Sequence, residues 1–428
     1  MPLTPTSLRR SSVGQTFSAL RHPNYRLYFA GQAFSLIGTW MQIIAAGWLV
    51  LRITNSPFLL GLVTAMETLP SLFFSLVAGA LADSFDKRRV AIVTQTLSAL
   101  QAVALGVLVL TNHATFWNVF WLALVAGIIN AFDLPIRQSL IFEIVGPDDL
   151  VNASALNSVV FNVARIAGPA IAATIIVHFG EAANFFANAG SYAFVVAALS
   201  RMRSLPPSIA GSRRRFVTQS ALNGINYVVR HPVLSRMFLA LMIYSVFGFN
   251  YILLMPVIAR LQLHGTATAL GFLVSSLGAG ALLGSLVLAA RGASRFRSLL
   301  LMSFAFPLSI AAFAFAGTLR WASVLAAMLG FCMVQFIVRF FTFLQTEARG
   351  SMRGRVMGLY NMFLMGLSPI GALQAGALAE RFGAGAALAA GAALCVLASL
   401  LLVSPHRRLR EQEQAVRQHE AATASAAK

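Results

Sequence analysis

The chain has 428 residues, of which 58% are hydrophobic and 11% are charged, and its formal net charge is +19. Soluble globular proteins carry roughly 45–50% apolar and about 25% charged residues, so this composition excludes a soluble protein. The apolar residues gather in runs of about 20, the length that crosses the hydrocarbon core of a bilayer. The sequence therefore predicts an all-α polytopic membrane protein.

Twelve membrane-spanning helices are predicted, arranged as two six-helix bundles. They cover residues 27–51, 58–82, 89–110, 117–136, 154–178, 183–200, 234–259, 268–290, 298–317, 320–344, 356–379 and 384–403. The first run lacks an A-x-A cleavage site, so we expect it to be retained as a span. The resulting division is a tail (1–26), a bundle (27–200), a linker (201–233), a second bundle (234–403) and a tail (404–428). Apolar residues with helical spacing near the end of the linker predict an amphipathic helix at the membrane surface.

The positions of Lys and Arg predict the orientation of the chain in the membrane. On the predicted topology, 25 of the 32 basic residues lie on the side of the two tails, and only Arg52, Arg260, Arg320 and Arg381 lie in loops on the other side. Both termini are therefore expected in the cytoplasm, with the protein in a bacterial inner membrane. The positive charge is explained by topology and by attraction to anionic lipid headgroups, so nucleic-acid binding is not expected.

The two halves of the sequence resemble each other at corresponding places. The tripeptide RHP precedes the first span (21–23) and the seventh span (230–232). Acidic residues, Glu143 and Glu347, follow the fourth and tenth spans. Glycine or serine precedes proline within the fifth span and the eleventh span, at the pairs Gly168, Pro169 and Ser368, Pro369, where we expect the helices to bend. Together these similarities at corresponding positions favour a six-plus-six duplication, which is typical of one large class of secondary transporters.

A dense charge cluster, GALADSFDKRRV (79–90), lies between the second and third spans. Its pattern G-x-L-A-D-x-x-D-K-R-R resembles the signature of the major facilitator superfamily, although Asp86 stands where a glycine is usual. Three further segments are similar to the branch of this superfamily that includes enterobactin and multidrug exporters: RHPNYRLYFAGQAFSLIGTWMQ (21–42), AFDLPIRQS (131–139) and LNSVVFNVARIAGPA (156–170). The similarity covers most of the N-terminal half, whereas the C-terminal half matches mainly in its layout.

The charge cluster is expected to act as a conformational latch. Gly79 permits close helix approach, and Asp83 needs a positive partner because it ends a helix, where the macrodipole disfavours an anion. The resemblance implies that this partner is the start of the eleventh span. Asp86 is placed to cap the third span, and the basic triplet is placed to contact lipid phosphates or Asp133. The resemblance also implies a gate at the end of the fourth span. The full latch set is Gly79, Asp83, Asp86, Lys87, Arg88, Arg89, Asp133 and Arg137.

Ionisable groups inside predicted spans are functional candidates because their burial is costly. Glu67 in the second span is a candidate for binding and releasing a proton, with a structural carboxyl as the alternative. Arg165 in the fifth span is expected to pair with Glu67 or Asp133. Arg339 in the tenth span has no acidic residue within its own span, so it is a candidate for binding an anionic substrate group. The alternative for Arg339 is a bond to backbone carbonyls or to Glu347.

The resemblance implies that spans one, four, seven and ten line a central cavity. The substrate-binding candidates on these spans are Gln32, Ser35, Thr39, Trp40, Gln42, Asn130, Tyr244, Asn250, Tyr251, Gln335 and Arg339. The alternative for each aromatic residue is ordinary helix packing. Gly280 and Gly284 form a GxxxG pattern, which predicts close packing of the eighth span.

Several activities are excluded by motifs that the sequence lacks. It has no G-x-x-x-x-G-K-[ST] loop for ATP, no H-E-x-x-H, no G-x-S-x-G and no paired Cys/His set, so an enzyme, a cofactor or a metal site is not expected. The leading hypothesis is a monomeric secondary transporter that exports small amphipathic, siderophore-like or drug-like molecules by proton antiport. The alternatives are an importer or symporter of a small metabolite on the same fold, and a non-transporting membrane scaffold or sensor.

Overall fold

The computed structural model describes residues 17–82, 86–202, 217–291, 296–350 and 352–403, and every element within these ranges is a helix. The elements are η1 (Ser18–Arg21), α2 (Pro23–Thr54), α3 (Pro57–Ala82), α4 (Lys87–Leu110), α5 (Phe116–Phe179), α6 (Glu181–Ser200), α7 (Val217–Arg230), α8 (Pro232–Ile243), η2 (Tyr244–Gly248), α9 (Tyr251–Val257), η3 (Ile258–Gln262), α10 (Ala267–Arg291), α11 (Phe296–Ala314), α12 (Leu319–Glu347), α13 (Arg353–Gly366), α14 (Ser368–Phe382) and α15 (Ala384–Leu400).

Ten helical stretches of the described chain are long and apolar enough to cross a membrane. One of them, α5, contains a non-helical residue at Gly146 (φ 71°, ψ 179°). Both parts of α5 run along α2, because Arg137 donates a hydrogen bond to Gln32 and the Ala153 carbonyl accepts one from Tyr25. Helix α5 therefore folds back on itself. Its second pass and the shorter apolar helix α15 bring the apolar segments in the described ranges to twelve, the number expected from the sequence.

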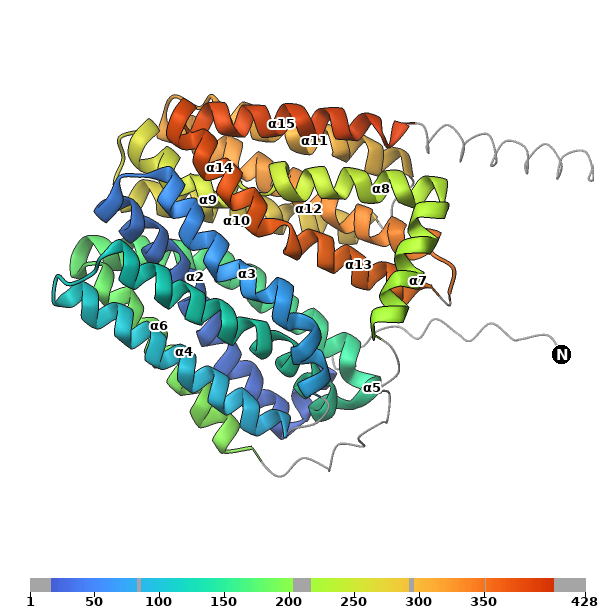
Figure 1. The fold of residues 1–428 in the computed structure, drawn as a ribbon. Helices are drawn as coiled ribbons and strands as arrows, with labels where there is room; N and C mark the ends of the chain where they lie inside the picture. Colours follow the sequence, from blue (N-terminus) through green and yellow to red (C-terminus); the bar gives the residue numbers. More distant parts are fainter. Residues whose placement is uncertain (1–16, 83–85, 203–216, 292–295, 351, 404–428) are drawn as a thin grey trace, which may run out of the picture.

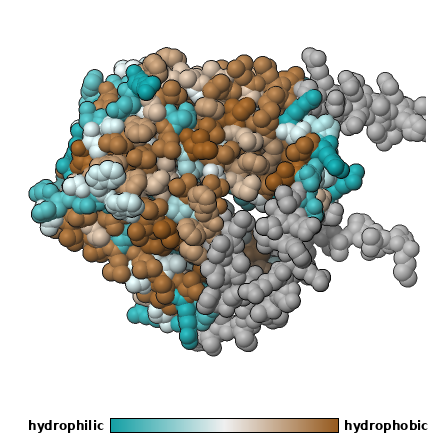
Figure 2. All heavy atoms as spheres, viewed as in Figure 1, coloured by the Kyte–Doolittle hydropathy of each residue, from teal (hydrophilic) through white to brown (hydrophobic). Residues whose placement is uncertain are grey.

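The helices gather in two groups, α2–α6 and α8–α15 (Figure 1). Contacts between α3 and α14 and between α5 and α10 join the groups. We call the end of the molecule at which helices α2, α4, α8 and α13 begin the basic end, which lies toward the right of Figure 1, and the other end the far end. Figure 2 shows apolar residues over the middle of the molecule and hydrophilic residues gathered toward its two ends, the distribution that a bilayer requires.

Side-chain caps fix where several helices begin. The Asp86 carboxylate accepts hydrogen bonds from the backbone N–H groups of Arg88 (3.0 Å) and Arg89 (3.2 Å), so the prediction that Asp86 caps the third span is confirmed. At the far end, Thr115 caps α5 and Thr318 caps α12 in the same way. These bonds satisfy backbone donors that the first helical turn leaves without partners.

Two predicted spans are interrupted near their middles. The seventh span is divided into α8, η2, α9 and η3, in which η2 and η3 are π-helical turns. The eleventh span is divided at Leu367, and Pro369 lies in the first turn of the new helix α14, where a missing N–H costs little.

Gly168 and Pro169 differ from this pattern, because α5 stays helical through them. A Cβ added at Gly168 would lie 2.6 Å from the Trp40 Cβ, so this glycine allows close helix packing, and the expected bend at the pair stays a prediction.

The GxxxG pattern of α10 does pack closely, as predicted. A Cβ at Gly280 would lie 1.7 Å from the Ala327 carbonyl oxygen, and one at Gly284 would lie 2.9 Å from the Phe331 carbonyl oxygen. Only glycine allows α10 and α12 to approach this closely.

The linker forms a helix, α7, in the part that the structure describes. This helix packs against α13: a Cβ at Gly224 would lie 3.2 Å from the Arg355 Cβ, and Val228 is buried. One face of α7 is therefore covered by protein, and the prediction that this helix lies at the membrane surface stays a prediction.

The two RHP tripeptides occupy corresponding places in the structure. His22 lies 2.8 Å from Asp149, just past the bend of α5, and Ser18 donates a hydrogen bond of 2.5 Å to the same carboxylate. In the second group, His231 lies 3.8 Å from Glu347 at the end of α12. Each histidine thus connects the start of its group to the acidic residue that follows the fourth helical pass of that group. Glu143 does not take part, because it pairs with Lys87.

Replacing Asp149 by asparagine is expected to lower the melting temperature of the purified protein. Hydrogen bonds from Ser18 and His22 hold the pKa of Asp149 below its ordinary value, so its stabilising contribution is present at neutral pH and disappears as the pH falls through that lowered pKa. The difference in melting temperature between wild type and Asp149→Asn should therefore shrink below about pH 4. Thermal melts at a series of pH values test this, and a difference that is constant down to acidic pH would contradict it.

Candidate functional site

The basic triplet after α3 binds partners that the sequence did not predict. Lys87 forms an ion pair with Glu143, and Arg88 donates hydrogen bonds to the carbonyls of Leu199 (2.7 Å) and Ser200 (2.8 Å) at the end of α6. Arg89 lies 3.4 Å from Asp86 and is largely exposed. The expectation that the triplet pairs with Asp133 is therefore wrong. Asp83 lies outside the described residues, and Gly79 lies in a part of α3 whose side-chain surroundings are not described.

Asp133 instead forms the centre of a buried polar cluster between α2, α4 and α5. Its carboxylate lies 2.7 Å from the Arg137 guanidinium and accepts hydrogen bonds from Thr94 (2.6 Å) and Gln95 (3.0 Å). Arg137 also donates a hydrogen bond of 2.7 Å to the side-chain amide oxygen of Gln32. Gln32 was expected in the substrate cavity, but it belongs to this cluster.

The structure contains an internal cavity of about 240 Å³. It lies among helices of the first group, and residues of α9 and α14 close it from the second group. Its lining residues are Thr39, Gln42, Ile43, Ile44, Ala46, Gly47, Val50, Leu60, Val63, Thr64, Glu67, Ser98, Gln101, Leu105, Val119, Ala123, Ala126, Asn130, Asn188, Tyr192, Phe249, Asn250, Ile252, Leu253, Pro256, Ser368 and Ala372. The mixture of apolar walls and a few polar groups is typical of small-molecule sites.

Four of the eleven predicted substrate residues line this cavity: Thr39, Gln42, Asn130 and Asn250. Sequence reasoning missed an amide chain on the same wall, in which Asn188 donates to Gln42 (2.7 Å) and Gln42 donates to Gln101 (3.1 Å). Gln101 belongs to α4 and Asn188 to α6, the third and sixth spans, which the family resemblance did not place at the cavity. Their polarity inside otherwise apolar spans was the available signal.

The other predicted substrate residues lie elsewhere, because helix rotation turns them toward neighbouring helices. Ser35 is buried within the helix bundle and Trp40 packs against Phe161. Tyr244 donates a hydrogen bond to the Ser303 carbonyl, and Tyr251 is buried outside the cavity lining.

Arg339 is also placed away from the cavity. It bonds to the backbone carbonyl of Gln335 (3.1 Å) and to the Ser298 hydroxyl (3.3 Å), while Gln335 donates to the Gly284 carbonyl. Arg339 therefore does not line this cavity, and its bond to the Gln335 carbonyl agrees with the alternative of backbone bonding, while a role in binding an anionic substrate group stays a prediction.

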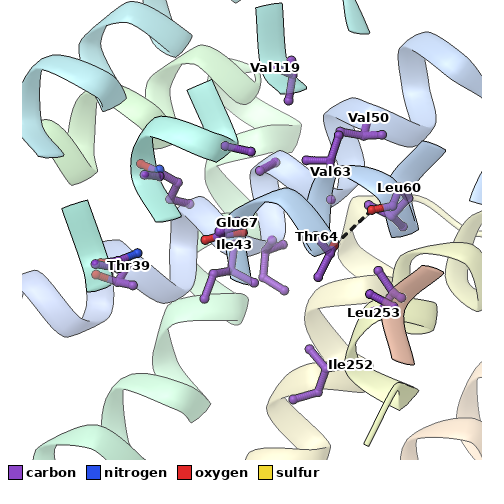
Figure 3. A pocket seen from close by; sticks show the side chains of 18 of the residues that line it. Thr39, Ile43, Val50, Leu60, Val63, Thr64, Glu67, Val119, Ile252 and Leu253 are labelled. Carbon is purple, nitrogen blue, oxygen red and sulfur yellow. Dashed lines mark hydrogen bonds between the residues drawn. The ribbon is translucent and has the colours of Figure 1, made fainter. Parts of the chain in front are cut away.

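Glu67 lies on α3 and faces the cavity beside Thr64 and Ile43 (Figure 3). A Cβ at Gly127 would lie 2.3 Å from the Glu67 carbonyl oxygen, so α5 packs directly on the backbone at this position. Thr64 does not donate a hydrogen bond to the Glu67 carboxylate, because its hydroxyl donates to the Leu60 carbonyl at 3.0 Å. Within the described ranges the Glu67 carboxylate has no hydrogen-bonding or ion-pair partner.

Arg165 is the second unpaired charge in the interior. Its side chain is 8% exposed, and its Nε and Nη2 atoms have no hydrogen-bonding partner among the described residues. It lies where α5 meets α10: a Cβ at Gly278 would lie 3.1 Å from the Arg165 carbonyl oxygen. The expected pairing of Arg165 with Glu67 or Asp133 is wrong, and the residue is not part of the cavity lining.

The two groups of helices meet most closely at the far end. A Cβ at Gly61 of α3 would lie 2.5 Å from the Ala372 carbonyl oxygen, and one at Gly376 of α14 would lie 2.8 Å from the Pro57 carbonyl oxygen. The Glu380 carboxylate accepts hydrogen bonds from the Ser56 hydroxyl (2.9 Å) and the Phe58 N–H (3.1 Å). A carboxylate from one group thus caps the positive end of a helix in the other group.

Metal binding finds no support in the described ranges, where no three His, Cys, Asp or Glu side chains gather closely enough to hold an ion.

Replacing Asp133 by alanine is expected to destabilise the protein by about 3 kcal/mol, the low end for a broken buried ion pair, because Arg137 is left without its counter-ion. The double variant Asp133→Ala, Arg137→Leu should recover part of this loss, since it removes both charges. Chemical or thermal unfolding of the purified variants measures both effects. A double variant less stable than Asp133→Ala would contradict this account of the cluster.

Comparison with known proteins agrees with this architecture. Residues 14–426 match the family described as transmembrane secretion effectors. The multidrug efflux pump Tap of Mycolicibacterium fortuitum is 30% identical over 395 residues, which are 88% of this chain and 94% of Tap. The enterobactin exporter EntS of Shigella boydii is 24% identical over 386 residues, 89% of this chain and 92% of EntS.

Among solved structures, the D-xylose–proton symporter matches with a TM-score of 0.69 at 12% identity, covering 89% of this chain and 97% of that chain. This likeness shows the fold of the major facilitator superfamily, and the resemblance seen in the sequence motifs is confirmed. The chain belongs to the transmembrane secretion effector family of major facilitator transporters, and it is a membrane transporter, not an enzyme.

Proposed function

We propose that this protein is a secondary active exporter of small amphipathic molecules, either drug-like or siderophore-like, in a bacterial inner membrane. The observation that carries the proposal is the cavity bounded by helices of both groups, since such a site is exposed alternately when two bundles rock about it. The names of Tap and of the enterobactin exporter support export as the direction. In this proposal the groups are two six-helix bundles, and the basic end, with both termini, faces the cytoplasm.

Alternating access requires contacts that form in one state and separate in the other. At the far end, the proposed outer gate is the crossing of Gly61 and Gly376 together with the Glu380 cap. At the basic end, the proposed latch is the charge cluster that begins at Gly79 and Asp83, with the Asp133–Arg137 pair as the adjoining gate. The exposed side chain of Arg89 is free to reach lipid phosphates beyond its weak pair with Asp86.

Protons are the proposed coupling ion, and Glu67 is the proposed proton-binding group. Its carboxylate faces the cavity with no partner in the described ranges, which is the position a reversible proton carrier needs. Arg165 is proposed to assist through its charge at the α5–α10 contact, without pairing with Glu67. Substrate and proton must each favour a different state of the transporter for one to drive the other.

Glu67→Gln and Asp83→Asn are each expected to lower proton-driven efflux by roughly tenfold or more, a loss of about 1.4 kcal/mol in coupling, while the protein still inserts in the membrane. The measurement is substrate-dependent quenching of a pH gradient in inverted vesicles, with insertion checked by quantifying the folded protein. Glu347→Gln is the matched control, because it removes a carboxylate outside the cavity.

Wild-type proton-driven efflux in both variants would overturn the proposed coupling. Substrate movement in the opposite direction under the same imposed gradient would identify an importer or symporter. A complete lack of substrate-dependent quenching in wild type would favour a scaffold or sensor.

A further inference from the structure

The cavity has one ionisable carboxyl group on its wall. Among the described residues that line it, Glu67 is acidic and none is Lys, Arg or His. Two buried arginines of the first group lie outside the cavity lining: Arg137 pairs with Asp133, and Arg165 lies at the α5–α10 contact. The interior of the cavity is therefore negative wherever Glu67 is ionised.

Burying an ionised carboxylate without a partner in a membrane interior costs free energy, and a positively charged ligand offsets part of that cost by attraction. A ligand that brings a second negative charge adds to it, because the low dielectric of the site strengthens repulsion. Within the described ranges Glu67 has no protein partner that a ligand would first need to displace.

The rest of the wall is divided between polar and apolar surfaces. The amide chain of Gln42, Gln101 and Asn188 comes from the first group, as does Glu67, and all four residues line the cavity. The α9 segment supplies Ile252 and Leu253 from the second group, which Figure 3 shows on a separate helix from Glu67 and Thr64. Phe249, before α9, adds an aromatic ring that can stack on an apolar or cationic body.

We propose that this cavity selects amphipathic organic cations, such as amines or quaternary ammonium compounds with an apolar body, and rejects polycarboxylate molecules. Glu67 supplies the countercharge, the amide chain binds polar substituents, and the α9 surface holds the apolar body. The inference rests on the proposed function in one respect, that this cavity is the transport site. It chooses the drug-like class of cargo over the siderophore-like class.

The test compares three ligands that share a benzyl group and differ in charge: benzyltrimethylammonium, benzyl alcohol and benzylsulfonate. Binding to the purified full-length protein is measured by calorimetry or saturation-transfer NMR, without any proton gradient. We expect wild type to bind the cation roughly tenfold or more tighter than the alcohol, and the sulfonate more weakly than the alcohol.

Glu67→Gln should lose the preference for the cation and keep its affinity for benzyl alcohol, which also shows that the variant is folded. Glu67→Asp should keep part of the preference because it keeps the charge, and Glu347→Gln should bind all three ligands as wild type does. Unchanged cation affinity in Glu67→Gln, or sulfonate binding as tight as cation binding in wild type, would overturn the proposal.

Failure of this test is distinguishable from failure of the proposed function. Efflux of substrates against a gradient, with no preference for cations, would contradict the proposed charge selection and still support the proposed export. Selective cation binding without any transport would support the cation site and contradict the proposed export.

Discussion

The close crossing of α3 and α14 at the far end is, with the contact between α5 and α10, what joins the two helix groups. Gly61 and Gly376 let the backbones approach to a distance that any side chain would prevent, and Glu380 caps the start of α3 from the other group. This contact lies beside the residues that close the cavity, since Leu60 and Ala372 line it from the same two helices. In the proposed transport cycle, opening of the cavity at the far end requires this crossing to separate.

The molecule has few charged residues, and those with protein partners lie in a different region from those without. Toward the basic end, Lys87, Arg88 and the Asp133–Arg137 pair have protein partners, so they hold helices α2, α4, α5 and α6 together. In the interior, Glu67 and Arg165 lack partners among the described residues. The paired charges hold helices of the first group against one another in this conformation, whereas an unpaired charge is available to a proton or a ligand.

The sequence predicted the features that depend on composition and local pattern. Span positions follow from apolar runs, the Asp86 cap from its place before a helix, and the α10–α12 packing from Gly280 and Gly284. It did not predict which partner each charge binds, because that depends on how each helix is rotated and on contacts between residues far apart in the chain. Arg339 and Gln32 were expected in the cavity for that reason, whereas Gln101 and Asn188 were missed.

The central claim is that the far-end crossing controls access to the cavity. Distances between pairs of spin labels, measured at both ends by double electron–electron resonance, test it. Spin labels at the exposed positions 112 and 320 report the far end, and labels at 151 and 353 report the basic end, with Cys332 and Cys395 replaced by alanine. Gly376→Leu is predicted to lengthen the far-end distance and shorten the basic-end distance, because the larger side chain collides with Pro57 and Gly61. Unchanged distances in a folded Gly376→Leu protein, or lengthening at both ends, would contradict the account.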